Sequence, residues 1–247
     1  MASDSVVLEA TFVQLPPSGA EDESLWTHVD EQHLPMDTRR RLQDNGLRTG
    51  LVGSQFPDEL RRLLDRPGVN ELFAAGRSPE ETELFSQQKR LQMRAGQSHP
   101  ILVTPGKREE MVVLLREEGT VRAQRFADPR GYFTIQSSPL GDGRVRLDLT
   151  PEIEHGELRQ RIVGGQGSLL LKNSRERHIF EELRISTVLS PGQTLLLTCT
   201  PAPKGLGEQL FVSGKSNAQA RTLMLVRLAQ TQIDDLFLDD DLLPSGG

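Results

Sequence analysis

The chain has little cysteine and few aromatic residues for a length of 247 residues. Its single cysteine, Cys199, excludes an intrachain disulfide. Aromatic residues make up only 4% of the sequence, so we expect leucine and valine to fill the core. No run of 18 apolar residues occurs, which argues against a transmembrane helix. The formal net charge of −6, without a basic patch, argues against a nucleic-acid partner.

The beginning of the chain carries no signal-peptide pattern. Two interpretations stay open. In one, Met1 begins a cytosolic protein; in the other, it begins a mature segment to which a start residue was added. The sequence alone does not choose between these two origins.

Residues 1–76 have the pattern of a small α/β module. Apolar and polar residues alternate from Val6 to Val13, as they do in a half-buried strand, and Pro16-Pro17 ends the run. Periodicity and capping signals predict three helices, at residues 22–32, 35–45 and 57–66, and one more strand at residues 47–52.

Residues 77–232 have mainly the pattern of antiparallel strands. Apolar and charged residues alternate over residues 144–150, and the preceding turn Gly141-Asp142-Gly143 supplies the positive φ angles of a tight hairpin. Further runs at 84–94, 101–104, 111–115 and 121–126 also read as strands. The predicted fold class is therefore α+β, with a small α/β module before a mainly antiparallel β domain.

A second hairpin is predicted over residues 183–199, with its turn at Pro191-Gly192. Cys199 lies on the apolar face of its run, so we interpret it as a buried structural thiol rather than a nucleophile. Residues 221–231 are apolar on both faces, which favours a buried central strand, with a helix as the alternative. The expected core contains Leu147, Leu149, Leu183, Ile185, Leu195 and Leu197.

Two glycine-containing motifs share part of the pattern of a phosphate-binding loop. Gly214-Lys215-Ser216 lacks the earlier glycine of that pattern, because Gln209 stands in its place, so we interpret it as a surface turn. Gly164-Gly165-Gln166-Gly167 lacks the lysine and hydroxyl partner and is interpreted as a flexible loop. We therefore predict no cofactor-binding residues and no cofactor.

No metal site or catalytic constellation emerges from the sequence. Glu152 and Glu154 share a face of the predicted strand, whereas His155 points away from them. The next histidine, His178, lies beyond the intervening loop, so the ligand set of a catalytic zinc site is not assembled. No G-x-S-x-G elbow occurs either. We predict no catalytic and no metal-binding residues, and no enzymatic activity.

Several β signatures follow one another in a fixed order along residues 84–231. They are Ala95-Gly96-Gln97 before an aliphatic strand, Gly131 to Pro139, Val145 to Glu152, Ser190 to Thr194 between aliphatic strands, and Gly207 to Phe211 before a last aliphatic strand. In this order they resemble the C-terminal domain of bacterial secretins, the ring-forming outer-membrane gates of type II and type III secretion systems. The stretches Leu25-Trp26 and Asn45 to Arg48 are similar to a module found beside such domains in planctomycete envelope proteins.

The resemblance implies a non-catalytic structural protein of the cell envelope, in the periplasm or at the outer membrane. Such a protein acts in protein secretion by forming oligomers or by docking to envelope proteins, through exposed strand edges. Between Val103 and Phe126, however, the family has long amphipathic hairpins, and this chain has one short, charged hairpin. Membrane association without a transmembrane helix, and a cytoplasmic location, both stay open.

The end of the chain, residues 233–247, is predicted to be a disordered acidic tail. Its aspartates keep it solvated, yet it carries more large apolar residues than a solubilising tail needs. The candidate partner-binding residues are Leu236, Phe237, Leu238, Asp239, Asp240 and Asp241. This gives an alternative function, a soluble monomeric adaptor that binds a partner protein through its tail. A solvated end without a partner is the other interpretation.

Overall fold

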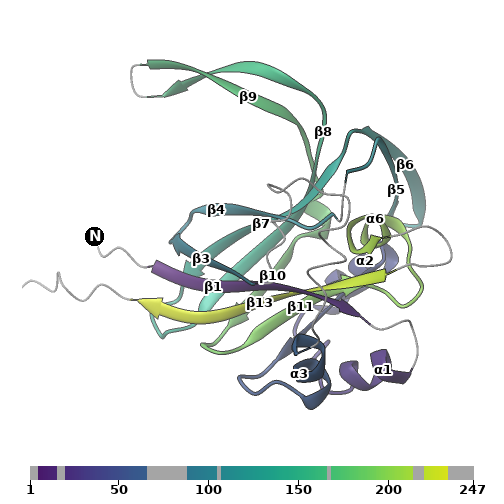
Figure 1. Cartoon of the computed structure of the whole chain (residues 1–247), viewed down its shortest axis with the longest axis vertical. Helices are drawn as coiled ribbons and strands as arrows, with labels where there is room; N and C mark the ends of the chain where they lie inside the picture. The colour runs from purple at the N-terminus through teal and green to yellow at the C-terminus, as the bar shows by residue number, and fades with distance from the viewer. Residues whose placement is uncertain are drawn as a thin grey trace, which may run out of the picture.

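Two antiparallel sheets pack face to face, and helices cover the outer face of one of them (Figure 1). This computed structural model describes residues 5–15, 20–65, 88–104, 107–165, 168–213 and 220–232, with only the backbone at 20, 21, 88, 160–173 and 232. The predicted tail and Gly214-Lys215-Ser216 lie outside these residues. No helix in the described ranges is long and apolar enough to cross a membrane.

Sheet A has the strand order β2-β11-β13-β1-β3, with β12 pairing with β13. Its strands are β1 (Ser5–Leu15), β2 (Leu47–Val52), β3 (Gln88–Arg94), β11 (Thr194–Cys199), β12 (Val212–Ser213) and β13 (Ala220–Gln232). The central strand β13 is apolar on both faces because the second sheet covers one face and helices cover the other. The buried central strand predicted at 221–231 is confirmed, and the helical alternative is wrong.

Sheet B has the order β10-β8-β7-β4, and β9 pairs with a more distal part of β8. Its strands are β4 (Ser98–Leu102), β7 (Arg130–Pro139), β8 (Val145–Gly165), β9 (Ser168–Ile179) and β10 (Ile185–Leu189). Gly141 and Gly143, at φ 76° and 82°, make the turn between β7 and β8, which confirms that hairpin. The hairpin of β5 (Glu110–Glu117) and β6 (Thr120–Ala127) is confirmed as well.

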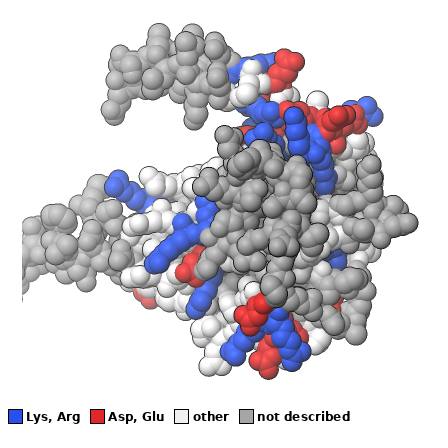
Figure 2. Space-filling model, viewed as in Figure 1, with Lys and Arg blue, Asp and Glu red and all other residues white. Residues whose placement is uncertain are grey.

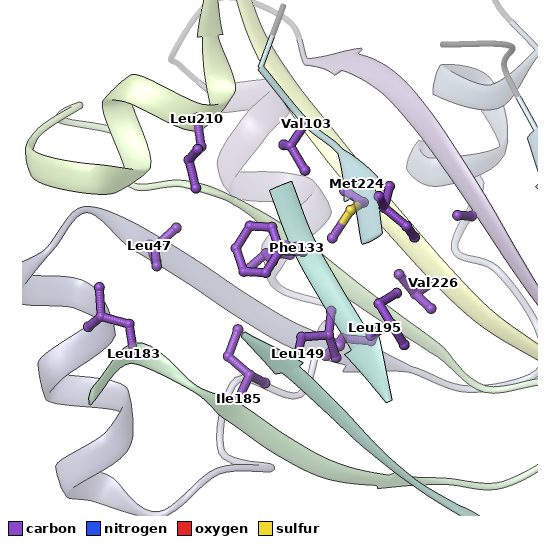
Figure 3. Close-up of a cluster of buried hydrophobic side chains, with 14 of the residues drawn as sticks. Leu47, Val103, Phe133, Leu149, Leu183, Ile185, Leu195, Leu210, Met224 and Val226 are labelled. Carbon is purple, nitrogen blue, oxygen red and sulfur yellow. The ribbon is translucent and has the colours of Figure 1, made fainter. Parts of the chain in front are cut away.

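The main core lies between the two sheets (Figure 3). Phe133 of β7 and Phe211 pack against each other in it, with tilted rings whose centroids are 6.0 Å apart. All six residues of the predicted core are fully buried in this cluster: Leu147, Leu149, Leu183, Ile185, Leu195 and Leu197. The core is therefore mainly aliphatic, as the scarcity of aromatic residues predicted.

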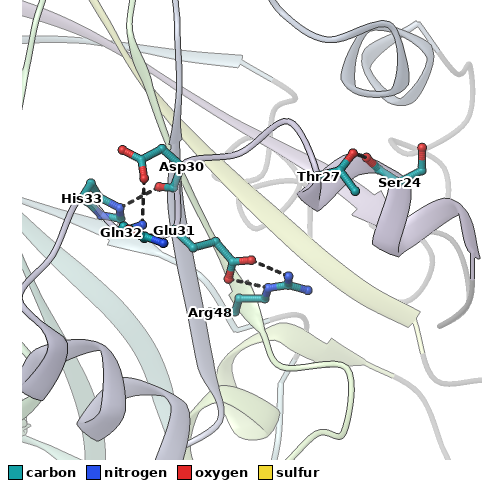
Figure 4. A network of polar contacts seen from close by, with 7 residues as sticks. All are labelled: Ser24, Thr27, Asp30, Glu31, Gln32, His33 and Arg48. Carbon is teal, nitrogen blue, oxygen red and sulfur yellow. Dashed lines mark hydrogen bonds and ion pairs between the residues drawn. The ribbon is translucent and has the colours of Figure 1, made fainter.

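A second, smaller core lies on the outer face of sheet A, under α1 (Ala20–Trp26) and α3 (Asp58–Leu64). The predicted helix over 22–32 ends early because Asp30 instead exchanges two backbone hydrogen bonds with Leu51 of β2. Figure 4 shows how this connection is held: Arg48 donates to Glu31 at 2.9 and 2.6 Å. The Arg48 guanidinium also lies 4.0 Å from the centre of the Trp26 ring.

The remaining helices are α2 (Met36–Asp44), which confirms the prediction at 35–45, and α6 (Gly205–Phe211), which was not predicted. The single turn of 3₁₀ helix η1 (Glu181–Leu183) occupies the start of the strand predicted at 183–189. In α6, two glycines weaken the helical pattern of the sequence. One of them, Gly207, lies against the carbonyl oxygen of Gly46, where a Cβ atom has no room.

The predicted division near residue 76 needs correction, because sheet A joins strands from both sides of it. β1 lies between β13 and β3, and β2 pairs with β11. The first residues of the chain therefore share a sheet and a core with the last described ones. Local periodicity predicted these five strands but carries no information on which distant strand each one pairs with.

The hairpin predicted over residues 183–199 also needs correction. Both strands exist, but β10 pairs with β8 in sheet B, whereas β11 pairs with β2 and β13 in sheet A. The turn at Pro191-Gly192 therefore carries the chain from one sheet to the other. The turn at residues 95–97 does the same between β3 and β4. Both strands of such a crossing face one core, so their apolar patterns match those of a hairpin.

Candidate functional site: an arm with unpaired strand edges

Strand β8 continues past sheet B as a two-stranded extension with β9 (Figure 1). β7 pairs with β8 only between Val145 and Glu154, whereas β9 pairs with β8 as far as Gly165. We call residues 155–165 of β8 and 168–176 of β9 the arm. No other described strand pairs with the arm, so each of its strands has one edge without a backbone partner among the described residues.

A bulge bends β8 where the arm begins. His155 is paired with Glu176 and Arg159 with Ser174, so β8 advances by four residues while β9 advances by two. Gly156 lies in the bulge at φ 74°, in the left-handed region that glycine tolerates. Bulges bend a strand and increase its twist. Accordingly, the arm arches away from the sheets in Figure 1.

On the core side, aromatic rings hold the base of the arm. Phe126 of β6 lies 5.0 Å from His155 and 5.5 Å from His178, measured between ring centroids. His178 in turn packs edge-on against Phe180 at 4.7 Å. The two histidines therefore pack on aromatic rings from the hairpin β5–β6 and from the end of β9.

On the opposite face, ion pairs hold the same base. Arg177 of β9 contacts Glu152 at 3.2 Å and Glu154 at 2.7 Å, across the pairing of β8 with β9. Arg175 contacts the Asp128 carboxylate at 2.6 Å and donates to the Asp128 backbone carbonyl at 2.8 Å. Figure 2 shows basic and acidic side chains side by side where the arm leaves the body. The base is thus fixed on both faces, and the free edges begin beyond it.

The distal part of the arm combines strand pairing with an apolar sequence. Ile162 pairs with Leu171 and Val163 with Leu170, just before the end of the arm. Nearer the base, the side chain of Leu158 is 65% exposed. Among the described elements no third strand covers this part, so the arm offers backbone hydrogen-bonding groups next to apolar residues.

The structure brings Glu152 and Glu154 together on one face, with Arg177 between them, and places His155 on the other face against Phe126. In the described ranges, no cluster of three or more histidine, cysteine or acidic side chains has the geometry of a metal site. Cys199 is buried in the main core, and burial raises the pKa of its thiol to about 11. A thiol with so high a pKa is a poor nucleophile at neutral pH.

Sequence reasoning missed the arm. The sequence predicts a flexible loop at residues 164–167, but β8 extends to Gly165 and β9 begins at Ser168. The missed signal was the pair of apolar runs on either side of these glycines, Ile162-Val163 and Leu169-Leu170-Leu171, which is a hairpin pattern. The candidate tail residues Leu236 to Asp241 lie outside the described residues.

Comparisons of the chain with protein-family models, with curated proteins and with solved structures found no match.

Proposed function

We propose that this chain is a non-catalytic assembly protein that associates with copies of itself by strand addition to the arm. The observation that supports this proposal is the pair of unpaired edges on β8 and β9 beyond Glu154. Free backbone N–H and C=O groups on an edge strand are a template for pairing with another chain. An isolated two-stranded hairpin is marginally stable in water, so a third strand stabilises it.

The distal half of the arm is the part suited to this pairing. Proteins usually protect edge strands with charges, prolines or bulges. The base of the arm has such protection in its bulge and in the ion pairs of Arg175 and Arg177. The stretch from Ile162 to Leu171 contains no proline and no charged residue. The proposed contact is therefore made there.

The finer proposal follows the resemblance to secretins. Secretins are assembled from many copies, and a cell-envelope location would bring this chain into contact with such assemblies. In this proposal the protein belongs to the envelope, in the periplasm or at the outer membrane, and its partners are proteins. The β-rich α+β fold is compatible with the proposal without being specific to it.

Size-exclusion chromatography with light scattering tests the assembly. The wild-type protein is expected to have a mass above the 27.5 kDa of one chain. The double substitution Leu169→Lys with Leu171→Lys should return it to monomer mass, because lysines on an edge strand oppose pairing with another chain.

The matched control places lysines at two other apolar positions, Met36 and Leu140. Both are exposed, at 74% and 38%, and both lie outside the arm. The control variant should keep the mass of the wild type. A wild-type protein that stays monomeric at every concentration, or an arm variant that keeps the larger mass, contradicts the proposal.

The adaptor function remains the second candidate, because the sequence of the tail combines aspartates with leucines and a phenylalanine. In this alternative the protein is a monomer and Phe237 anchors the tail in a basic groove of a partner. A chain that ends at Gln232 separates the two functions. If the arm is the site of assembly, this shortened chain still forms the assembly. If the tail is the binding site, the shortened chain no longer binds any partner.

A further inference from the structure

A pocket of about 310 Å³ lies on the outer face of sheet A. Phe56, Leu63 and Leu64, from α3 and the turn before it, form one wall. Val13 of β1 and Leu225 of β13 belong to the sheet that forms the floor. The volume is at the lower end for small-molecule sites, so the pocket accommodates a ligand of amino-acid size and not a nucleotide.

Three polar residues cross the floor of this pocket in one row. Glu9 of β1 and Thr194 of β11 are both register partners of Arg227 in β13. Partners on adjacent antiparallel strands have Cα atoms about 4.5–5.5 Å apart and side chains on the same face. A carboxylate, a guanidinium and a hydroxyl thus lie side by side on the floor of a pocket whose wall is apolar.

These polar groups are not satisfied by one another. The Arg227 Nε and the Thr194 Oγ1 are buried, and neither has a hydrogen-bond partner among the described residues. Glu9 and Arg227 are neighbours, yet the described residues provide no ion pair within 4.0 Å for either. A cation–π contact holds the Arg227 guanidinium 5.6 Å from the centre of the Phe56 ring. Buried polar atoms without partners are rare and costly, so a ligand that pairs with them gains affinity.

We propose that this pocket binds a free α-amino acid with a large apolar side chain. The ligand carboxylate accepts hydrogen bonds from the Arg227 Nε and the Thr194 hydroxyl, and the ligand ammonium donates to the Glu9 carboxylate. The ligand side chain packs against Phe56 and Leu64. Adjacent opposite charges in the pocket match the adjacent opposite charges of a zwitterion. This proposal goes beyond the assembly function and does not depend on the arm.

Titration of the full-length protein with L-leucine and L-phenylalanine, followed by methyl NMR, tests the proposal. The methyl signals of Val13, Leu64 and Leu225 should shift in a saturable manner, while those of Leu147 in the other core stay unchanged. N-acetyl-L-leucine lacks the ammonium, L-leucinamide lacks the carboxylate and L-alanine lacks the apolar bulk. Each should bind about 10- to 100-fold more weakly than L-leucine, because each leaves one group of the pocket unpaired or unfilled.

Substitutions then assign the contacts. Arg227→Gln and Glu9→Gln should each weaken L-leucine binding by a similar factor. The matched controls are Arg122→Gln and Glu117→Gln, an exposed ion pair on the β5–β6 hairpin, and they should leave binding unchanged. Should Arg227→Gln not fold, the ligand series on the wild-type protein still decides the question. Unshifted pocket methyls, or equal binding of L-leucine and its analogues, overturns the proposal.

Discussion

Leu147 and Ile185 represent the residues that hold sheet B to sheet A, because both are fully buried in the main core. Replacing either one with alanine removes apolar contacts and leaves a cavity. We predict that Leu147→Ala and Ile185→Ala each lower the free energy of unfolding by about 2–5 kcal/mol. Denaturant unfolding measures this change. Leu140→Ala, at a 38% exposed position in the β7–β8 turn, serves as the control.

Titration of the Cys199 thiol makes the free energy of unfolding depend on pH. Burial raises the pKa of its thiol from 9.0 to about 11. Between these two values the unfolded chain releases the thiol proton while the folded chain keeps it, so the free energy of unfolding falls as pH rises. We predict that the free energy of unfolding of Cys199→Ala falls less than that of the wild type as the pH rises from 9.0 to about 11. Parallel stability curves for the two proteins would show that the thiol pKa is not raised.

The sequence predicted some residue roles well and missed others for a physical reason. Glu152, Glu154 and His155 lie on the faces that the strand period assigned to them. The pocket row of Glu9, Thr194 and Arg227 could not be predicted, because it joins three strands that are distant in the sequence. Only the strand register brings those side chains together.

At the scale of elements, α6 depends on a glycine that local propensity disfavours. A Cβ atom at Gly207 would collide with the backbone of Gly46, which cannot move as a side chain can. We predict that Gly207→Ala lowers the free energy of unfolding by about 1–3 kcal/mol, although alanine is the better helix former. Thermal or denaturant unfolding of the variant and the wild type measures this difference in free energy. Gly53→Ala is the matched control, because nothing lies within 4 Å of the added Cβ there.

Elements with a clear period and a clear stop signal were predicted almost to the residue. β2 covers the predicted residues 47–52, and α2 ends at Asp44, one residue before the predicted end at Asn45. The arm was missed because its glycines resemble a loop and its strands mix charged with apolar residues. A strand that packs on no core needs no regular alternation of apolar and polar residues, so its sequence gives only a weak signal.

At the scale of the whole molecule, the chain closes on itself. β1 pairs with β13, so the first and last described strands lie next to each other in sheet A. Neither this closure nor the crossing of the chain between sheets at Pro191-Gly192 is encoded in a local pattern. The β-rich α+β class could be predicted from the sequence, whereas the sheet topology needed the structure.

Beyond the body, each strand of the arm has one edge without a backbone partner among the described residues, and the central claim is that another copy pairs with such an edge. Amide hydrogen exchange at low and high protein concentration measures this directly. The account predicts that amides of residues 168–174 exchange more slowly at high concentration, while amides of β7 do not change. Exchange of the arm that is independent of concentration would contradict it.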